Sequence, residues 1–161
     1  MRTVEEMEHE VENILRGAGR AIEWRSWEQA TQGAFDELAV IRFNGNCGVP
    51  AWPHDSTADG PLGFTHISDG AVLPFSEIAC EKIAGSVGPA ILRMEPAQAE
   101  TVFGRAVGRV VAHELIHMIS GSLIHSHEGI ARSAFSPSDL TSERLDLSPT
   151  DLPRVAGKER R

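Results

Sequence analysis

Lysine, cysteine and tyrosine are scarce in this sequence, and long apolar runs are absent. Only two of its 15 basic residues are lysines, tyrosine does not occur, and the net charge is −8. Proteins that bind nucleic acid usually carry a basic stripe, and this chain has none. Its one basic cluster is KERR at residues 158–161, which we interpret as a frayed end. We therefore expect no nucleic-acid partner.

No apolar run approaches the length needed to cross a membrane, so we expect no membrane partner either. The first ten residues, MRTVEEMEHE, are too acidic and polar for a signal peptide. The cytoplasm is therefore the expected compartment of the chain as written, and export would require an upstream signal that has been removed.

The two cysteines, Cys47 and Cys80, are too few to form a metal site by themselves. The sequence does not decide between a disulfide and two buried thiols, and we favour thiols. With 161 residues, 41% of them hydrophobic, the chain is long enough for one domain whose core needs no disulfide bonds for stability.

Hydrophobic periodicity predicts two main helices. Residues 3–16 place apolar side chains on one stripe, and glycines follow directly. A longer helix is predicted over residues 96–120, with Pro96 in its first turn and Gly121 as its C-terminal cap. Within it, Gly104 and Gly108 permit close packing against a neighbour. A short helix is expected around residues 77–84.

Strands are expected over residues 21–27, 38–43, 63–68 and 71–75, and a surface loop over residues 44–61. Pro74 cannot donate a hydrogen bond to a neighbouring strand, so the strand over residues 71–75 is expected at the edge of the sheet. Together with the helices, these strands predict an α+β fold.

One motif carries most of the chemical information. The long helix contains His113-Glu114-Leu115-Ile116-His117, which reads H-E-x-x-H. Two histidines four residues apart lie on the same face of a helix, one turn from each other, so both can reach one metal ion. Glu114 follows the first histidine, where it can contact a water molecule beside the metal without binding the metal itself.

A catalytic zinc site needs a third protein ligand and one open position. Gly121 allows the chain to leave the helix and turn back, and His125 follows at a suitable distance. We therefore predict His125 as the third ligand. His127, Glu128 and, further along, Glu143 remain as alternatives.

Residues 107–140, VGRVVAHELIHMISGSLIHSHEGIARSAFSPSDL, resemble a family of small bacterial zincin-type proteins. This family is related to the metzincins and carries a pattern of the kind HExxHxxxGxxxH. Weaker similarity extends upstream. PLGFTHIS at residues 61–68 and AVLPFSEIACEKI at residues 71–83 resemble the family's strands and short helix, and residues 10–27 resemble its first helix and the strand after it.

The resemblance implies a single metzincin-like zinc metalloprotease domain over residues 1–161, with a flexible C-terminal tail from about residue 153. It implies a small mixed, twisted sheet, with an edge strand over a cleft, packed on the N-terminal helix and on the long motif helix. Residues 129–132 would form a turn below the metal. Ala131 stands there where the family has a methionine, so the apolar floor under the metal would be thinner.

By the same resemblance, zinc (Zn²⁺) would be bound by His113, His117 and His125, with Glu114 as general base. This set predicts hydrolysis of a peptide or protein substrate, in which Glu114 takes a proton from water and passes it to the leaving amine. An extended peptide would pair with the predicted edge strand at residues 71–75. Because tyrosine is absent, a common donor to the developing oxyanion is missing. His127 and Arg132 are the alternative donors.

Three other functions remain open. The first is a non-catalytic zinc-binding protein with a degenerate zincin fold, and the intact Glu114 argues against it. The second is a metal-dependent ribonuclease with three histidines, which the acidic composition disfavours. The third is a gluzincin-type site with a distant glutamate ligand. Only Glu128, Glu143 and Glu159 follow the second histidine and could serve there.

Overall fold

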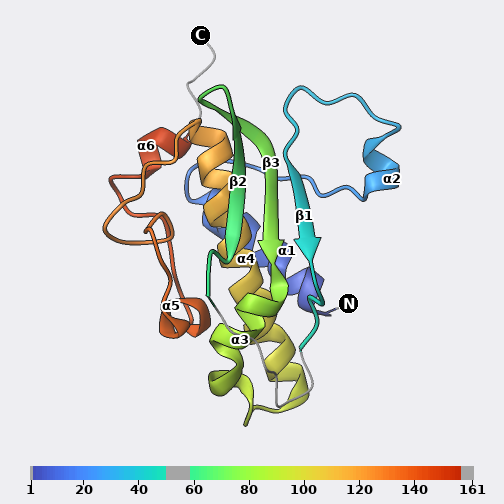
Figure 1. Ribbon diagram of the computed structural model, residues 1–161, viewed down its shortest axis with the longest axis vertical. Helices are drawn as coiled ribbons and strands as arrows, with labels where there is room; N and C mark the ends of the chain where they lie inside the picture. Colours follow the sequence, from blue (N-terminus) through green and yellow to red (C-terminus); the bar gives the residue numbers. More distant parts are fainter. Residues whose placement is uncertain (1, 50–58, 157–161) are drawn as a thin grey trace.

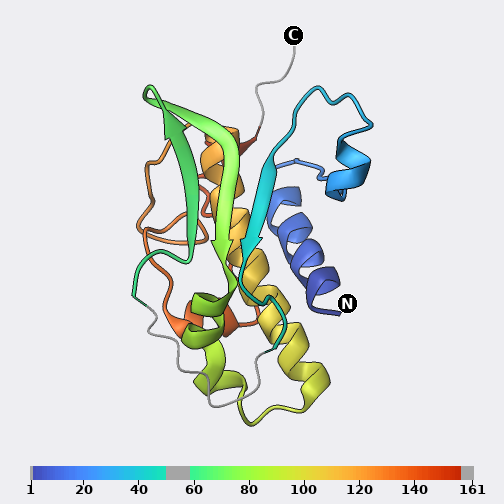
Figure 2. The same cartoon turned by 45° about the vertical axis from the view of Figure 1, so that its right-hand side comes forward.

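The long motif helix forms the centre of the structure. The computed structural model describes residues 2–49 and 59–156. In it, α4 (Pro96–Ser120) lies between a small sheet and α1 (Arg2–Arg16), which packs along α4 (Figures 1 and 2). The other elements, in chain order, are α2 (Trp27–Ala30), β1 (Val40–Asn44), β2 (Gly63–Ser68), β3 (Ala71–Ala79), α3 (Cys80–Ile91), α5 (Pro137–Thr141) and α6 (Leu152–Val155).

The sheet has three strands in the order β1-β3-β2, with β1 parallel and β2 antiparallel to β3. The prediction of an α+β fold with a small mixed sheet is therefore confirmed. The predicted edge position of residues 71–75 is wrong, because β3 is the central strand and β1 and β2 are the two edge strands. Pro74 is tolerated there for two reasons. Pairing with β1 begins only at Phe75, and the β2 pairing is irregular between Thr65 and Ile67.

Helices α1 and α4 approach closely because α4 has two glycines at the contact. A Cβ atom on Gly104 would lie 2.6 Å from the carbonyl oxygen of Thr3, and one on Gly108 would lie 2.8 Å from that of Met7. Of the predicted apolar stripe of α1, Met7, Val11, Ile14 and Leu15 are buried, whereas Val4 is exposed. Arg109, fully buried, donates from Nε to Glu10 at 2.8 Å and so adds an ion pair between the two helices.

The strand predicted over residues 21–27 is wrong. These residues have no partner strand in the described sheet, and a helix begins inside the stretch. Ser26 and Gln29 form a reciprocal capping box that starts α2 at Trp27. The short helix predicted around residues 77–84 is shifted, since β3 continues to Ala79 and α3 occupies Cys80–Ile91.

Cys47 and Cys80 form a disulfide, so the preference for thiols was wrong. The pairing follows from the sheet. β1 and β3 run parallel with Asn44 opposite Ala79, so the segments that leave the two strands stay side by side. The Cα atoms of the two cysteines are 5.0 Å apart.

The C-terminal segment, residues 121–156, crosses beside β2 and the end of α4 (Figure 1). Residues 153–155, predicted to begin a flexible tail, belong to α6, and the Val155 side chain is fully buried. The tail predicted beyond them, at residues 157–161, lies outside the described residues. In the described part of the chain, none of the helices has the length and apolar character of a membrane span.

Candidate metal centre

His113 and His117 lie on the face of α4 that is turned toward the C-terminal segment, and both are buried. Each ring is fixed by a backbone carbonyl. His113 Nδ1 donates to the oxygen of Ile130 and His117 Nδ1 donates to the oxygen of Ser122, both at 2.8 Å. A carbonyl oxygen can only accept, so the Nδ1 atoms carry the protons and the Nε2 atoms are left with lone pairs.

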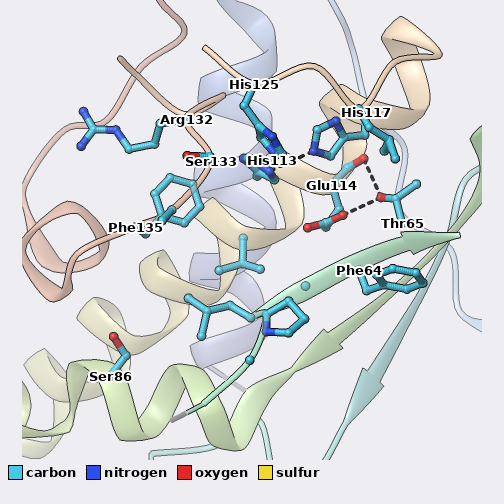
Figure 3. A pocket seen from close by; sticks show the side chains of 17 residues that line it. Phe64, Thr65, Ser86, His113, Glu114, His117, His125, Arg132, Ser133 and Phe135 are labelled. Atoms are coloured by element: carbon cyan, nitrogen blue, oxygen red, sulfur yellow. Dashed lines mark hydrogen bonds between the residues drawn. The ribbon is translucent and has the colours of Figure 1, made fainter. Parts of the chain in front are cut away.

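These two lone pairs point at each other. The Nε2 atoms of His113 and His117 are 3.0 Å apart (Figure 3). Two acceptors at this distance repel each other unless they share a cation. A metal ion bound by both Nε2 atoms removes the repulsion, and carbonyl bonds at Nδ1 are the usual partners of metal-binding histidines. The donor set therefore fits a metal ion.

The rings are neutral at pH 7, as metal ligands must be. Burial lowers the pKa of His113 to about 4 and also lowers the pKa of His117. The positive charge of Arg154 adds a smaller effect in the same direction on both rings. Metal binding at these nitrogens therefore displaces no proton near neutral pH.

His125 is brought to the same place by the turn at Gly121. This glycine has a left-handed backbone (φ 61°), and its N–H caps the end of α4 by donating to the carbonyls of His117 and Met118. The His125 ring stacks on that of His113 with centroids 5.2 Å apart. One ligand nitrogen from each of the three histidines lies within 4.8 Å of the others. His125 is the exposed member of the cluster.

The alternative third ligands lie elsewhere. His127, Glu128 and Glu143 are all exposed, and in the described part of the chain none of them joins the histidine cluster. The structure therefore brings together the three predicted histidines and separates them from the other three candidates.

Glu114 is also buried, and a strand of the sheet holds its side chain. Thr65 Oγ1 on β2 donates to Glu114 Oε2 at 2.5 Å, and Ser76 on β3 contacts the same hydroxyl at 2.6 Å. Because the single hydroxyl proton of Thr65 goes to the carboxylate, Ser76 donates to Thr65. Burial raises the pKa of Glu114, and the Thr65 hydrogen bond opposes that rise. Oε1 is left pointing into the open cleft (Figure 3).

Gly63 allows β2 to lie directly on the motif. A Cβ atom at this position would be 2.7 Å from Glu114 Oε1 and 2.9 Å from a methyl group of Val110. Any larger residue would have to displace either the strand or the carboxylate. Sequence reasoning missed both Gly63 and Thr65. The signal available was their alternation on β2, which puts both on the same face of the strand.

The histidines and Glu114 line a cleft of about 520 Å³ between β2 and the C-terminal segment (Figure 3). Its other walls are mainly apolar and include Pro61, Leu62, Val110, Leu123 and Phe135. Phe135 meets the His113 ring edge to face, with centroids 5.4 Å apart.

The turn expected at residues 129–132 lies against His113, because Ile130 supplies the carbonyl that fixes that ring. Ala131 is buried. Arg132, predicted as a possible oxyanion donor, lines the cleft, but its guanidinium donates to Asp139 and to the Gly129 carbonyl. His127 does not line the cleft. The Arg132 side chain points away from the histidines (Figure 3), so neither residue aims a donor at the cluster.

Comparisons of the chain with protein-family models, with curated proteins and with solved structures found no match. The described geometry therefore stands alone as the basis for a function, and the resemblance to zincin-type proteins stays a prediction.

Proposed function

We propose that this protein is a zinc-dependent hydrolase of the zincin type that cleaves peptide bonds. The observation that carries the proposal is the convergence of two buried Nε2 lone pairs, fixed 3.0 Å apart, beside the buried carboxylate of Glu114. His113, His117 and His125 would hold the ion. Three histidines leave a tetrahedral ion with one open position, which is the arrangement of catalytic rather than structural zinc sites.

Each residue of the chain has a separate task in this proposal. When bound, zinc would supply Lewis acidity, which makes water a better nucleophile near neutral pH and polarises the carbonyl under attack. Thr65 occupies Glu114 Oε2, so Oε1 is the atom that takes the proton of the attacking water and later gives it to the leaving amine. The raised pKa of Glu114 suits a group that must both accept and release a proton.

A peptide is favoured as the substrate because β2, one of the two edge strands of the sheet, lines the cleft. In the described residues, no other strand pairs with its outer edge. An extended peptide can add to this edge through backbone hydrogen bonds and lie across the histidines. This placement replaces the one expected from the sequence, which assigned the edge to residues 71–75.

The proposal is tested with purified protein and a pool of unstructured peptides analysed by mass spectrometry. The wild type is expected to contain close to one zinc per chain and to cleave peptides. Glu114→Gln is expected to keep the zinc and to lose about a hundredfold or more of the cleavage rate. Glu100→Gln, on the same helix but outside the cleft, is the matched control and should behave as wild type.

Three outcomes would overturn the proposal. A wild type without zinc after growth and purification with zinc present would remove the metal centre. Equal cleavage by wild type and Glu114→Gln would remove the assigned base. Retained zinc in both proteins with no cleavage of any peptide would favour the non-catalytic zinc-binding alternative.

A further inference from the structure

His125 differs from the other two histidines in having no hydrogen bond of its own. In the described residues, neither of its ring nitrogens has a protein partner, whereas the Nδ1 atoms of His113 and His117 are each held by a carbonyl. Its side chain is exposed and stands on an irregular segment. Something other than the ring must therefore hold His125 toward the cluster.

The residues on both sides of His125 are bound by α6 and its N-cap residue, Asp151. Arg154 donates from NH1 to the carbonyl oxygen of Ile124 at 2.9 Å. The hydroxyl of Ser126 donates to Asp151 Oδ1 at 2.5 Å. The residue before His125 is thus held at its backbone carbonyl, and the residue after it at its hydroxyl, by two side chains that lie 25 to 30 positions later in the chain. The Ser126 N–H is held in addition by the carbonyl oxygen of Ala131, at 2.8 Å.

Asp151 and Arg154 also hold each other. Arg154 Nε donates to Asp151 Oδ1 at 2.8 Å, and the Ser148 hydroxyl donates to Asp151 Oδ2 at 2.6 Å. The Asp151 side chain is only 3% exposed. A buried carboxylate with three donors and a paired guanidinium is a rigid unit, because any displacement would leave buried charge without a partner.

This unit is anchored to the body of the protein. Val155 in α6 is fully buried, and its carbonyl oxygen accepts a hydrogen bond from Arg20 Nε at 2.9 Å. Arg20 follows the end of α1. The position of α6 is therefore set by the core, and Asp151 and Arg154 transmit that position to residues 124–126.

We propose that Asp151 and Arg154 form a clamp that positions His125 for metal binding. The inference rests on the proposed metal centre. It means that Asp151 and Arg154 increase the affinity of the site for the metal ion. Neither residue contacts the ion itself. They act through the backbone of His125, in the way that outer residues orient metal ligands in other proteins.

The direction in which loss of Arg154 changes zinc affinity distinguishes a positioning role from an electrostatic one. Arg154 carries a positive charge close to the histidines, and by Coulomb repulsion this charge opposes binding of a cation. If the charge were its only influence, its removal would tighten zinc binding. If Arg154 positions His125, its removal weakens zinc binding.

The test measures the zinc dissociation constant by competition with a chelator. Arg154→Gln is expected to weaken zinc binding by about 10- to 100-fold. Ser126→Ala, which removes only one hydroxyl, should weaken it in the same direction by a smaller factor. Arg144→Gln is the matched control, because Arg144 lies in the same segment but pairs with Asp146 on the surface. It should bind zinc as the wild type does.

A double variant tests whether the effect passes through His125. In the His125→Ala background, adding Arg154→Gln should cause no further loss of zinc affinity. A further 10-fold loss there would mean that Arg154 supports the site in another way, and would overturn the clamp. Unchanged or tighter zinc binding by both Arg154→Gln and Ser126→Ala would also overturn it. Ser126→Ala alone decides the question if circular dichroism finds Arg154→Gln unfolded.

The failure of the clamp and the failure of the metal centre are distinguishable. A wild type that binds no zinc contradicts the proposed function. A wild type that binds zinc tightly, with variants that bind it equally well, contradicts only the clamp. If His125→Ala binds zinc as the wild type does, His125 is not a ligand and the clamp proposal fails with it.

Discussion

The two halves of the candidate site are built in different ways. The helix half, formed by His113, Glu114 and His117, is buried, and each side chain has a hydrogen-bond partner from another segment. The loop half is the exposed His125, whose ring has no protein partner in the described residues. The first half is ordered side chain by side chain, and the second is ordered through its backbone. In the proposed metal centre the same task, holding a nitrogen toward one ion, would thus be achieved by two different means.

The largest expected difference between the halves appears on removal of a ligand. His113→Ala and His125→Ala should each weaken zinc binding by more than about a hundredfold, the upper limit for residues that only support a ligand. In the metal-free protein, His113→Ala should lower the free energy of unfolding by about 2–4 kcal/mol. It leaves a cavity and a buried carbonyl of Ile130 without its donor.

His125→Ala should change the stability of the metal-free protein by less than about 0.5 kcal/mol, because the side chain is exposed. Urea unfolding of both variants after chelation measures the difference. Equal losses of stability would mean that the loop half is as firmly built into the fold as the helix half.

A smaller effect is expected on removing the hydrogen bond through which β2 holds Glu114 of the helix half. Thr65→Val keeps the shape of the side chain but removes the donor to Glu114 Oε2. A hydrogen bond to a charged group contributes about 1.5–3 kcal/mol, so kcat/KM for peptide cleavage should fall by about 10- to 100-fold. Zinc affinity should not change, and Thr65→Ser should restore the activity. Weakened zinc binding in Thr65→Val would show that the strand supports the ligands as well as the base.

The smallest expected effect is the loss at acidic pH of the stabilisation that Asp151 provides beside the loop half. Burial raises the pKa of Asp151, but hydrogen bonds from Ser126 and Ser148 and the charge of Arg154 outweigh it, so the pKa is lowered overall from 3.8. The stabilisation from this carboxylate is therefore complete above the unfolded value of 3.8 and is lost as the pH falls through the lower folded value.

Asp151→Asn should accordingly destabilise the metal-free protein by about 1–3 kcal/mol at pH 7. The gap between wild type and variant should narrow below pH 3.8. Thermal unfolding of both proteins across this range provides the measurement. A gap that stays constant down to pH 2 would contradict the assigned role of the charged form of Asp151.

The parts of the fold that the sequence predicted are those decided by local chemistry. The bounds of α4 follow from Pro96 at its start and Gly121 at its end, and β2 follows from a short alternating run. The placement of His125 also depends on a local feature, the left-handed turn at Gly121. The helix, the turn and the spacing of the motif together bring the three histidines to one place.

The errors have a common cause in contacts between distant segments. Residues 21–27 alternate as a strand does, but no strand lies beside them in the described structure. The disulfide depends on β1 lying parallel to β3, and the central position of Pro74 depends on where the pairing with β1 begins. The partners of the site, Thr65 and the Asp151–Arg154 pair, are far from the histidines in sequence. The alternation on β2 indicates which face Thr65 is on, but no local pattern indicates that this face meets Glu114.

The close packing of α1 against α4 also has a consequence for synthesis of the chain. The ion pair between Glu10 and Arg109 joins residues that are 99 positions apart. At about 5–20 residues per second, the ribosome adds Arg109 roughly 5–20 s after Glu10. A 15-residue helix is only marginally stable in water without a partner. Helix α1 is therefore translated before its partner α4, and its apolar stripe lacks that cover until the motif helix itself has been made.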